Sequence, residues 1–333
     1  MIKKVFSFLW RVFFIFLIVL FIAAHFFEEI YVFAAGKVAL PIRNFYSAIC
    51  NRFPFSVFEI GAMLFLLSIP FIVWRFIKGR GSLSPLTVAL QFFLVGYIIT
   101  LGINSARPIK SDSTTLTDEK YIKAAELIVD ELNSISSALP AEYSFTYTEL
   151  SLSVDRYATE RLGISYTHMP RVKKTALEKL LTDLGVLAYY SPVSAEITVN
   201  SELPEFMIPQ VAAHELMHYF GITREDEATF HSFVLARESL NSSLSYSAHV
   251  AAFSLVASRV YQTAPEAYFE IIEDLAPRVK KDIAERQSFI YKIRDNKGVA
   301  INDFTISVAD ERGKEAYNEA ASLIAEYMLE NAS

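Results

Sequence analysis

Three long apolar runs in the first 104 residues constrain the fold of this chain more than any other sequence feature. They cover residues 12–27, 60–73 and 86–103. With its flanks, each reaches the ~20 residues that a helix needs to cross a bilayer core of about 30 Å. The sequence therefore predicts three transmembrane helices at about residues 5–27, 56–76 and 86–103, within a membrane region of residues 1–104.

Charge divides the chain at the same place. Residues 1–110 carry 11 Lys or Arg and 3 acids, whereas the remainder carries 20 basic and 34 acidic residues. An acidic C-terminal part argues against nucleic-acid binding, which needs a basic surface. The single cysteine, Cys50, excludes an internal disulfide framework and a cysteine-rich zinc site. We expect a linker over residues 105–116 and a separate domain over residues 117–333.

The basic residues also predict the topology. They flank the start of the first run and fill the loop between the second and third runs (Lys3, Lys4, Arg11, Arg75, Lys78 and Arg80). Short loops rich in Lys and Arg stay in the cytoplasm. The end of the first run and the residues that follow it, "AAHFFEEIY", are too bulky for a signal-peptidase site, so this span is expected to be retained. Everything after residue 104 is then expected to lie outside the plasma membrane.

The C-terminal part has the pattern of an α+β domain that is mainly helical with a small sheet. A helix is predicted from Asp118, with Tyr121, Ala125, Ile128 and Leu132 on one face. A second helix is predicted over residues 172–187. The β-branched run "AEITVN", residues 195–200, predicts a strand, and from Gln210 onward the pattern is mainly helical.

The stretch "HELMH" suggests a metal centre on one of these helices. His214 and His218 are four residues apart, so on a helix they share one face and reach one ion at about 2.0–2.1 Å. Glu215, one step round the helix, is placed to act as a general base on a water activated by the metal. Pro209 suits the first turn of this helix, and Gly221 suits the position just past its end. This is the H-E-x-x-H arrangement of zinc peptidases.

Zinc sites of this kind need a third protein ligand. The three-histidine class would need His at position 224, which is Arg224. Glu225 and Glu227 remain, in a second helix that is expected to restart after Gly221 with Thr223 as its N-cap. Two residues are about 200° apart on a helix, so only one of the two acids can face the metal. The other would be solvated or paired.

Two resemblances extend this interpretation. "REDEAT", residues 224–229, resembles the R-E-x-E-A-D signature of membrane-bound gluzincins and the E-x-x-A-N element of the antirepressor metallopeptidases. In those families the Glu three residues before the Ala is the third zinc ligand, which corresponds to Glu225. Where they have Asp or Asn supporting a ligand histidine, this chain has Thr229.

"PQVAAHELMHYFGITREDEATF" is closer to a bacterial membrane family of unknown function with three N-terminal spans and an H-E-x-x-H domain. The likeness is close over about twenty residues and loose over most of the chain. It implies a zincin-like fold with residues 195–200 as the edge strand, where an extended peptide could pair.

The expected function is that of an integral-membrane zinc metallopeptidase of the bacterial plasma membrane. Its partners would be a protein or peptide substrate and the lipid bilayer. Zn²⁺ would be held by His214, His218 and Glu225, with Glu215 as the catalytic base. The alternative is a non-hydrolytic zinc-binding membrane sensor or scaffold. His231 and His249 are weaker candidate ligands, and Tyr246 or His249 a candidate oxyanion donor.

Overall fold

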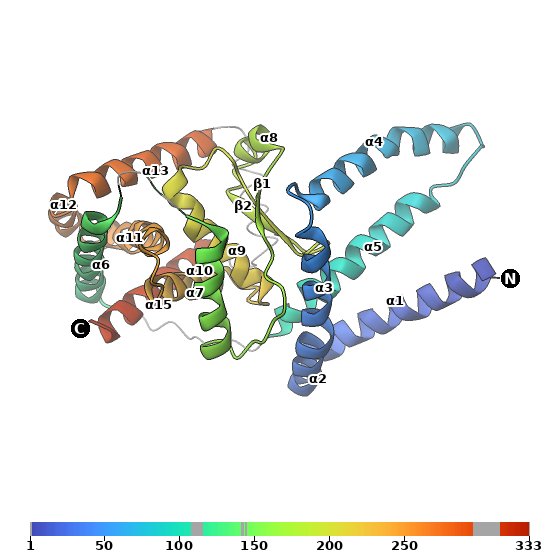
Figure 1. The fold of residues 1–333 in the computed structure, drawn as a ribbon, viewed down its shortest axis with the longest axis horizontal. Helices are drawn as coiled ribbons and strands as arrows, with labels where there is room; N and C mark the ends of the chain where they lie inside the picture. Colours follow the sequence, from blue (N-terminus) through green and yellow to red (C-terminus); the bar gives the residue numbers. More distant parts are fainter. Residues whose placement is uncertain (1, 108–115, 141–142, 144, 296–313, 333) are drawn as a thin grey trace.

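The computed structural model describes residues 2–107, 116–140, 143, 145–295 and 314–332 of the 333-residue chain. Three long apolar helices extend from one side of a globular body made of many helices and one small sheet (Figure 1). The sheet lies at the base of the apolar helices, and most of the remaining helices lie on its far side (Figure 1). The prediction of a mainly helical body with a small sheet is confirmed.

The apolar runs form α1 (Ile2–Phe26), α4 (Val57–Ile77) and α5 (Ser84–Thr100). Within the described part of the chain, α4 and residues 8–26 of α1 are long and apolar enough to cross a membrane. α5 has 17 residues, fewer than predicted, because the chain turns into η2 (Gly102–Ala106) where the third run was expected to continue. The second half of α5 is also largely buried against the rest of the protein.

Shorter helices connect α1 to α4. They are α2 (Glu28–Phe33), the π-helical segment η1 (Ala34–Ala39) and α3 (Leu40–Cys50). α3 presents Arg43, Ser47 and Cys50 to the protein interior. The Ser47 hydroxyl donates to the carbonyl of Ala195 at 3.1 Å, so α3 is attached to the segment that precedes the central strand.

The sheet has three strands in the order β1-β3-β2. β3 (Glu196–Val199) pairs in parallel with β1 (Val172–Lys174) and antiparallel with β2 (Ala188–Ser191). The predicted strand therefore exists, but its prediction as an edge strand is wrong because both of its edges are occupied. A peptide that added to this sheet would have to pair with β1 or β2.

The helix predicted over residues 172–187 is also wrong. The segment instead runs through β1, the short helix α8 (Glu178–Asp183) and a turn into β2. Gly185 ends α8 with φ +74°, a left-handed conformation that favours glycine. Leu180 is half exposed, whereas its neighbour Leu181 is buried. Pairing with β3 outweighs the helical spacing of the leucines.

The helical body surrounds one hydrophobic core. Its longer helices are α6 (Asp118–Ala138), α7 (Tyr147–Glu160), α9 (Ile208–Tyr219), α10 (Glu225–Arg237), α11 (Ser242–Thr263), α12 (Pro265–Glu273), α13 (Pro277–Asp295) and α15 (Lys314–Glu330), and the 3-10 turn η3 (Glu205–Met207) precedes α9. The predicted apolar face of α6 is buried and packs against α11. α9 packs against β2, β3, α10 and α11, which places it between the sheet and the helices.

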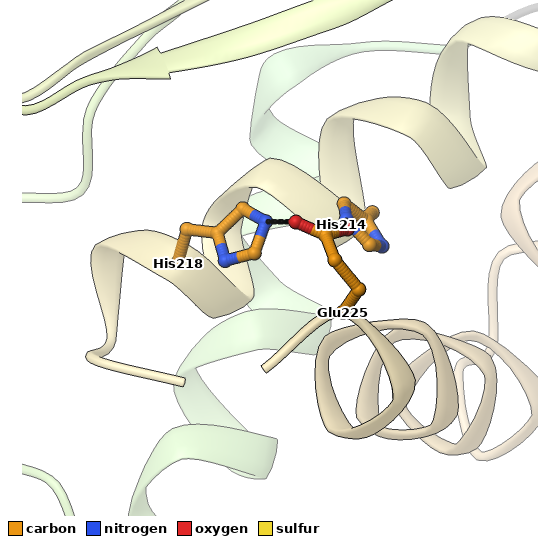
Figure 2. Close-up of side chains that lie close together, drawn as sticks. All are labelled: His214, His218 and Glu225. Carbon is orange, nitrogen blue, oxygen red and sulfur yellow. Dashed lines mark hydrogen bonds and ion pairs between the residues drawn. The ribbon is translucent and has the colours of Figure 1, made fainter. Parts of the chain in front are cut away.

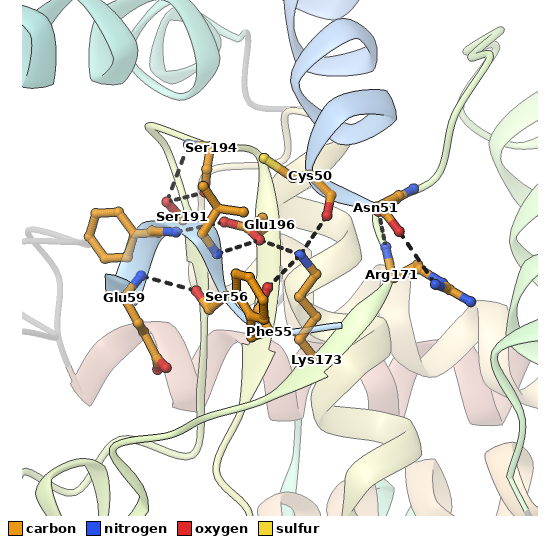
Figure 3. Close-up of polar contacts among 12 residues, drawn as sticks. Cys50, Asn51, Phe55, Ser56, Glu59, Arg171, Lys173, Ser191, Ser194 and Glu196 are labelled. Atoms are coloured by element: carbon orange, nitrogen blue, oxygen red, sulfur yellow. Dashed lines mark hydrogen bonds and ion pairs between the residues drawn. The ribbon is translucent and has the colours of Figure 1, made fainter. Parts of the chain in front are cut away.

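A buried ion pair attaches the sheet to the start of the apolar helix α4 (Figure 3). Lys173 of β1 and Glu196 of β3 form an ion pair in which both side chains are at most 3% exposed. The Glu196 carboxylate also accepts from the backbone amides of Val57 and Phe58 at 3.0 and 2.9 Å. Those amides lie in the first turn of α4, where helix N–H groups lack partners within the helix and a negative charge is stabilising.

Two further sets of contacts connect the sheet to α4. We call the whole connection, made by Lys173, Glu196 and Glu59, the joint. Lys173 donates to the carbonyls of Cys50 and Phe55 at 2.8 and 3.0 Å. The carboxylate of Glu59 in α4 accepts from the amide of Ala176 and the hydroxyl of Tyr189, each at 3.0 Å. The polar start of α4 is thus bonded to the sheet on several sides.

Candidate metal centre

The helix that carries "HELMH" begins and ends as its sequence predicts. Pro209 lies in the first turn of α9, where its missing N–H costs no hydrogen bond. Gly221 follows the helix with φ +91°, and its amide donates to the carbonyl of His218 at 3.0 Å. A Cβ at Gly221 would lie 2.5 Å from Oδ1 of Asn104, so this position requires glycine both for its conformation and for the close approach.

The side chains of His214, His218 and Glu225 converge beside this helix (Figure 2). Oε2 of Glu225 lies 3.1 Å from Nε2 of His214, and Oε1 lies 3.5 Å from Nε2 of His218. Ligands at 2.0–2.1 Å from a tetrahedral zinc ion lie about 3.3 Å from one another. The spacing and chemistry of this donor set therefore fit zinc. The three side chains are 12–21% exposed, so the group is open to solvent.

Each imidazole is oriented by a partner on its other nitrogen. Nδ1 of His218 donates to the carbonyl of Ile222 at 2.7 Å. Nδ1 of His214 lies 3.3 Å from the hydroxyl of Thr229. Both Nε2 atoms are thereby directed toward Glu225, the arrangement in which outer partners hold ligand histidines in position. Thr229 thus provides a hydroxyl contact where the resembled families use Asp or Asn.

Glu215 lies on the buried side of this group and is 9% exposed. Burial raises the pKa of its carboxyl, and the positive charges of His218 and His214 offset this effect in part. The backbone amide of Tyr190, in edge strand β2, also hydrogen-bonds the Glu215 carboxylate. The Glu215 carboxylate is therefore held between the imidazoles and the sheet.

The position at which α10 begins determines which acid lies beside the histidines. It begins at Glu225, with Arg224 rather than the predicted Thr223 at the N-cap. Glu227 instead lies 3.9 Å from Arg107 and 3.7 Å from Arg224, and its side chain is 4% exposed. Of the two acids left open by the sequence, the structure brings Glu225 to the histidines.

Without a metal, charge holds this group together. Burial lowers the pKa of His218, but the Glu225 carboxylate beside it outweighs this effect and raises the value to about 9. Conversely, although burial raises the pKa of Glu225, His218 and His214 hold it well below its ordinary value. At neutral pH the metal-free protein therefore carries a proton on His218 that a metal ion must displace.

Zinc affinity should consequently rise about tenfold per pH unit between pH 7 and 8, because one proton is released from His218 for each ion bound. The rise should level off above the pKa of about 9. Competition against a chelator at fixed pH values measures the slope. In the Glu225→Gln variant, the pH above which zinc affinity stops rising should fall toward the ordinary histidine pKa of ~6.5. An affinity that stays constant from pH 7 to 8 in the wild type contradicts this prediction.

The weaker sequence candidates have other partners. Nε2 of His249 pairs with Glu131 at 2.7 Å, and the hydroxyl of Tyr246 donates to Asp282 at 2.7 Å. Both side chains are fully buried in α11, so neither offers a group to a substrate. Nδ1 of His231 bonds the hydroxyl of Tyr157 at 2.7 Å. The structure does not bring these residues into the His214 group.

Two contributors could not be found from the sequence. They are the carbonyl of Ile222 and the amide of Tyr190, both backbone groups. Backbone groups leave no residue-type signal, because every residue except proline carries the same donor and acceptor. Only the fold places them at the site.

Comparison with known proteins gives a family but no activity. The model of one family, described as "Protein of unknown function (DUF3810)", matches residues 36–325. No curated protein and no solved structure matches the chain. The match spans the joint, the sheet and the candidate metal centre.

Proposed function

Because the chain belongs to this family of proteins of unknown function, DUF3810, its activity has to be inferred from its own residues, and we propose that it is an integral-membrane zinc metallopeptidase. One observation carries the proposal. Two imidazoles and a carboxylate converge with spacings that fit zinc, and the charges of both imidazoles act on a second, buried carboxylate, that of Glu215. A purely structural zinc site needs no such additional acid and is closed by its own ligands.

In this proposal His214, His218 and Glu225 hold zinc, which supplies Lewis-acid polarisation of a peptide carbonyl and lowers the pKa of water toward ~7. Glu215 accepts the proton of the attacking water and passes it to the leaving amine. Its buried position suits this work, because a raised carboxyl pKa brings the group closer to the operating pH. The amide of Tyr190 and the packing of α9 on the sheet hold Glu215 in place.

The membrane part of the proposal assigns three spans to α1, α4 and α5. The basic residues at the start of α1 and between α4 and α5 favour a cytoplasmic location for those ends. The sheet and the metal centre then lie on the outer face of the plasma membrane. Although α5 has only 17 residues, such a length is within the range that a transmembrane helix uses.

Zinc content tests the ligand set. Glu225→Gln should weaken zinc binding by about a hundredfold or more, which exceeds the upper range for loss of an outer partner. Glu227→Gln is the matched control, since the same chemical change two residues along the helix, on an acid that does not face the histidines, should leave zinc binding within a few fold. Metal analysis of purified full-length protein after dialysis against a weak chelator measures both variants. Equal zinc loss in the two, or zinc-free wild-type protein after gentle purification, contradicts the proposal.

Removal of zinc tests the activity itself. Stripping the wild type with a strong chelator should abolish cleavage of a peptide library, and restoring one equivalent of zinc should recover it. A protein that binds one zinc per chain but cleaves no peptide would instead fit the sensor or scaffold alternative.

A further inference from the structure

The attachment of the metal centre to the membrane helices indicates its class of substrate. Resting on the proposed function, we propose that the site cleaves polypeptides anchored in the same bilayer, at bonds within about three to six residues of the membrane boundary. Two features of the site favour such substrates: its height above the membrane and the rigidity with which that height is fixed.

The C-terminal end of α9, which carries the two histidines, contacts η2, the segment that follows α5. Asn104 lies four residues past Thr100, the last residue of α5. Its side-chain oxygen is so close to Gly221 that a Cβ there would lie 2.5 Å away. Asn104 also bonds back to α5 by donating to the carbonyl of Thr100 at 3.1 Å. The hydroxyl of Thr223 adds a contact to the Asn104 carbonyl at 3.5 Å.

α3 holds the same end of α9 from another direction. The hydroxyl of Tyr219, the last residue of α9, donates to Oδ1 of Asn44 at 2.8 Å. The Arg43 guanidinium lies over the Tyr219 ring at 5.9 Å and donates to the carbonyl of Thr100 at 3.4 Å. Arg43 is 2% exposed, so this contact is part of the interior.

The sheet side of the site is attached independently. Glu196 bonds the first turn of α4 through two backbone amides. The turn between β2 and β3 packs on α5, where a Cβ at Gly96 would lie 3.2 Å from Cα of Val193. Thr100 of α5 also donates its hydroxyl to the carbonyl of Pro192. Glu215 belongs to α9, and its side chain bonds the backbone of β2. Both of these elements are therefore joined to the outer ends of the membrane helices.

These contacts set a short distance between membrane and site. His218 is three residues before Gly221, a rise of about 5 Å along a helix. The four residues from Thr100 to Asn104, which end in the 3-10 segment η2, add about 8 Å. The metal centre thus lies on the order of 15 Å from the end of α5. An extended chain covers about 3.3 Å per residue, so four or five residues span this distance.

A domain at this fixed height is suited to chains that emerge from the bilayer. A site on a flexible tether would meet soluble and membrane-bound chains at many heights, whereas this site is held by α3, α4, α5 and η2 together. A substrate confined to the same membrane also gains effective concentration over a soluble one. The combination favours bonds near the boundary over bonds farther along the same chain.

The test compares one cleavable segment at different heights. A randomised eight-residue library, fused to a single membrane helix and reconstituted with the full-length protein in phospholipid vesicles, first supplies a segment whose cleavage needs zinc. That segment is then placed 3 or 15 residues beyond the helix, or presented without the helix. The near position should be cleaved at least tenfold faster than the far position, although both are tethered.

The outcomes separate this inference from the proposed function. Equal rates at the near and far positions, or faster cleavage of the untethered segment, overturn the membrane-anchored substrate and leave the peptidase standing. No zinc-dependent cleavage of any library member overturns both. A further check replaces the membrane helix of the substrate with one of unrelated sequence. If the near and far positions in vesicles are then cleaved at equal rates, the inference is also contradicted.

Discussion

Glu215→Gln is expected to leave zinc bound and to slow peptide cleavage by roughly a hundredfold to ten-thousandfold, the usual contribution of a general base. The amide can still accept from the Tyr190 N–H, so the position of the side chain should be kept. It cannot take the proton of water at neutral pH. Zinc content and the cleavage rate, measured on the same preparation, check both halves of the prediction.

Glu126→Gln supplies the control for this change. Glu126 lies on the exposed surface of α6, so the same substitution there should alter neither zinc content nor rate. If Glu215→Gln keeps its full rate with zinc bound, Glu215 is not the base. If a cellular phenotype of the wild type is also unchanged in that variant, the result supports the sensor or scaffold alternative.

Glu196→Gln should destabilise the protein by about 3–5 kcal/mol, because it leaves the buried Lys173 ammonium without its counter-charge. The new amide oxygen can accept from only one of the Val57 and Phe58 amides, so the loss includes one hydrogen bond to α4 as well as the counter-charge. The expected reading is a fall in the free energy of unfolding, or in the thermal midpoint, of detergent-solubilised protein.

The double variant Lys173→Met/Glu196→Gln tests that cause. It removes both charges, keeps an acceptor for the start of α4 and should recover most of the lost stability, since uncharged replacement of a buried pair is often neutral. Lys123→Met, at an exposed pair on α6, should change stability by less than about 1 kcal/mol. A single variant as stable as the wild type would show that the buried pair does not hold the joint together.

Local signals in the sequence were sufficient to predict α9. Pro209, the i,i+4 histidines and Gly221 all act within one helix, and α9 has the predicted start and end. The amphipathic face of α6 was equally local and is buried as predicted. Choosing Glu225 over Glu227 needed a resemblance, because both acids begin the same helix. In the structure, the turn at Gly221 directs the chain so that Glu225, and not Glu227, reaches the histidines.

The errors arose where long-range pairing overrides local pattern. Residues 172–187 have helical leucine spacing, yet Val172 and Lys173 pair with Ile197 and Thr198 of β3. That pairing also makes β3 central, which the strand's own sequence does not reveal. The buried neighbour of Lys173, Glu196, is 23 residues away and meets it only once the sheet forms.

The capping of α4 by Glu196 also bears on the order of biogenesis. If α4 spans the membrane as proposed, the ribosome releases it about 140 residues before the strand that supplies its carboxylate, and the helix first enters the lipid with its leading amides bonded only to water or headgroups. The final seating of that helix then awaits the folding of everything up to β3. Severing the chain after residue 107 is therefore expected to yield an N-terminal fragment that inserts but never matures, and that is cleared by cellular quality control.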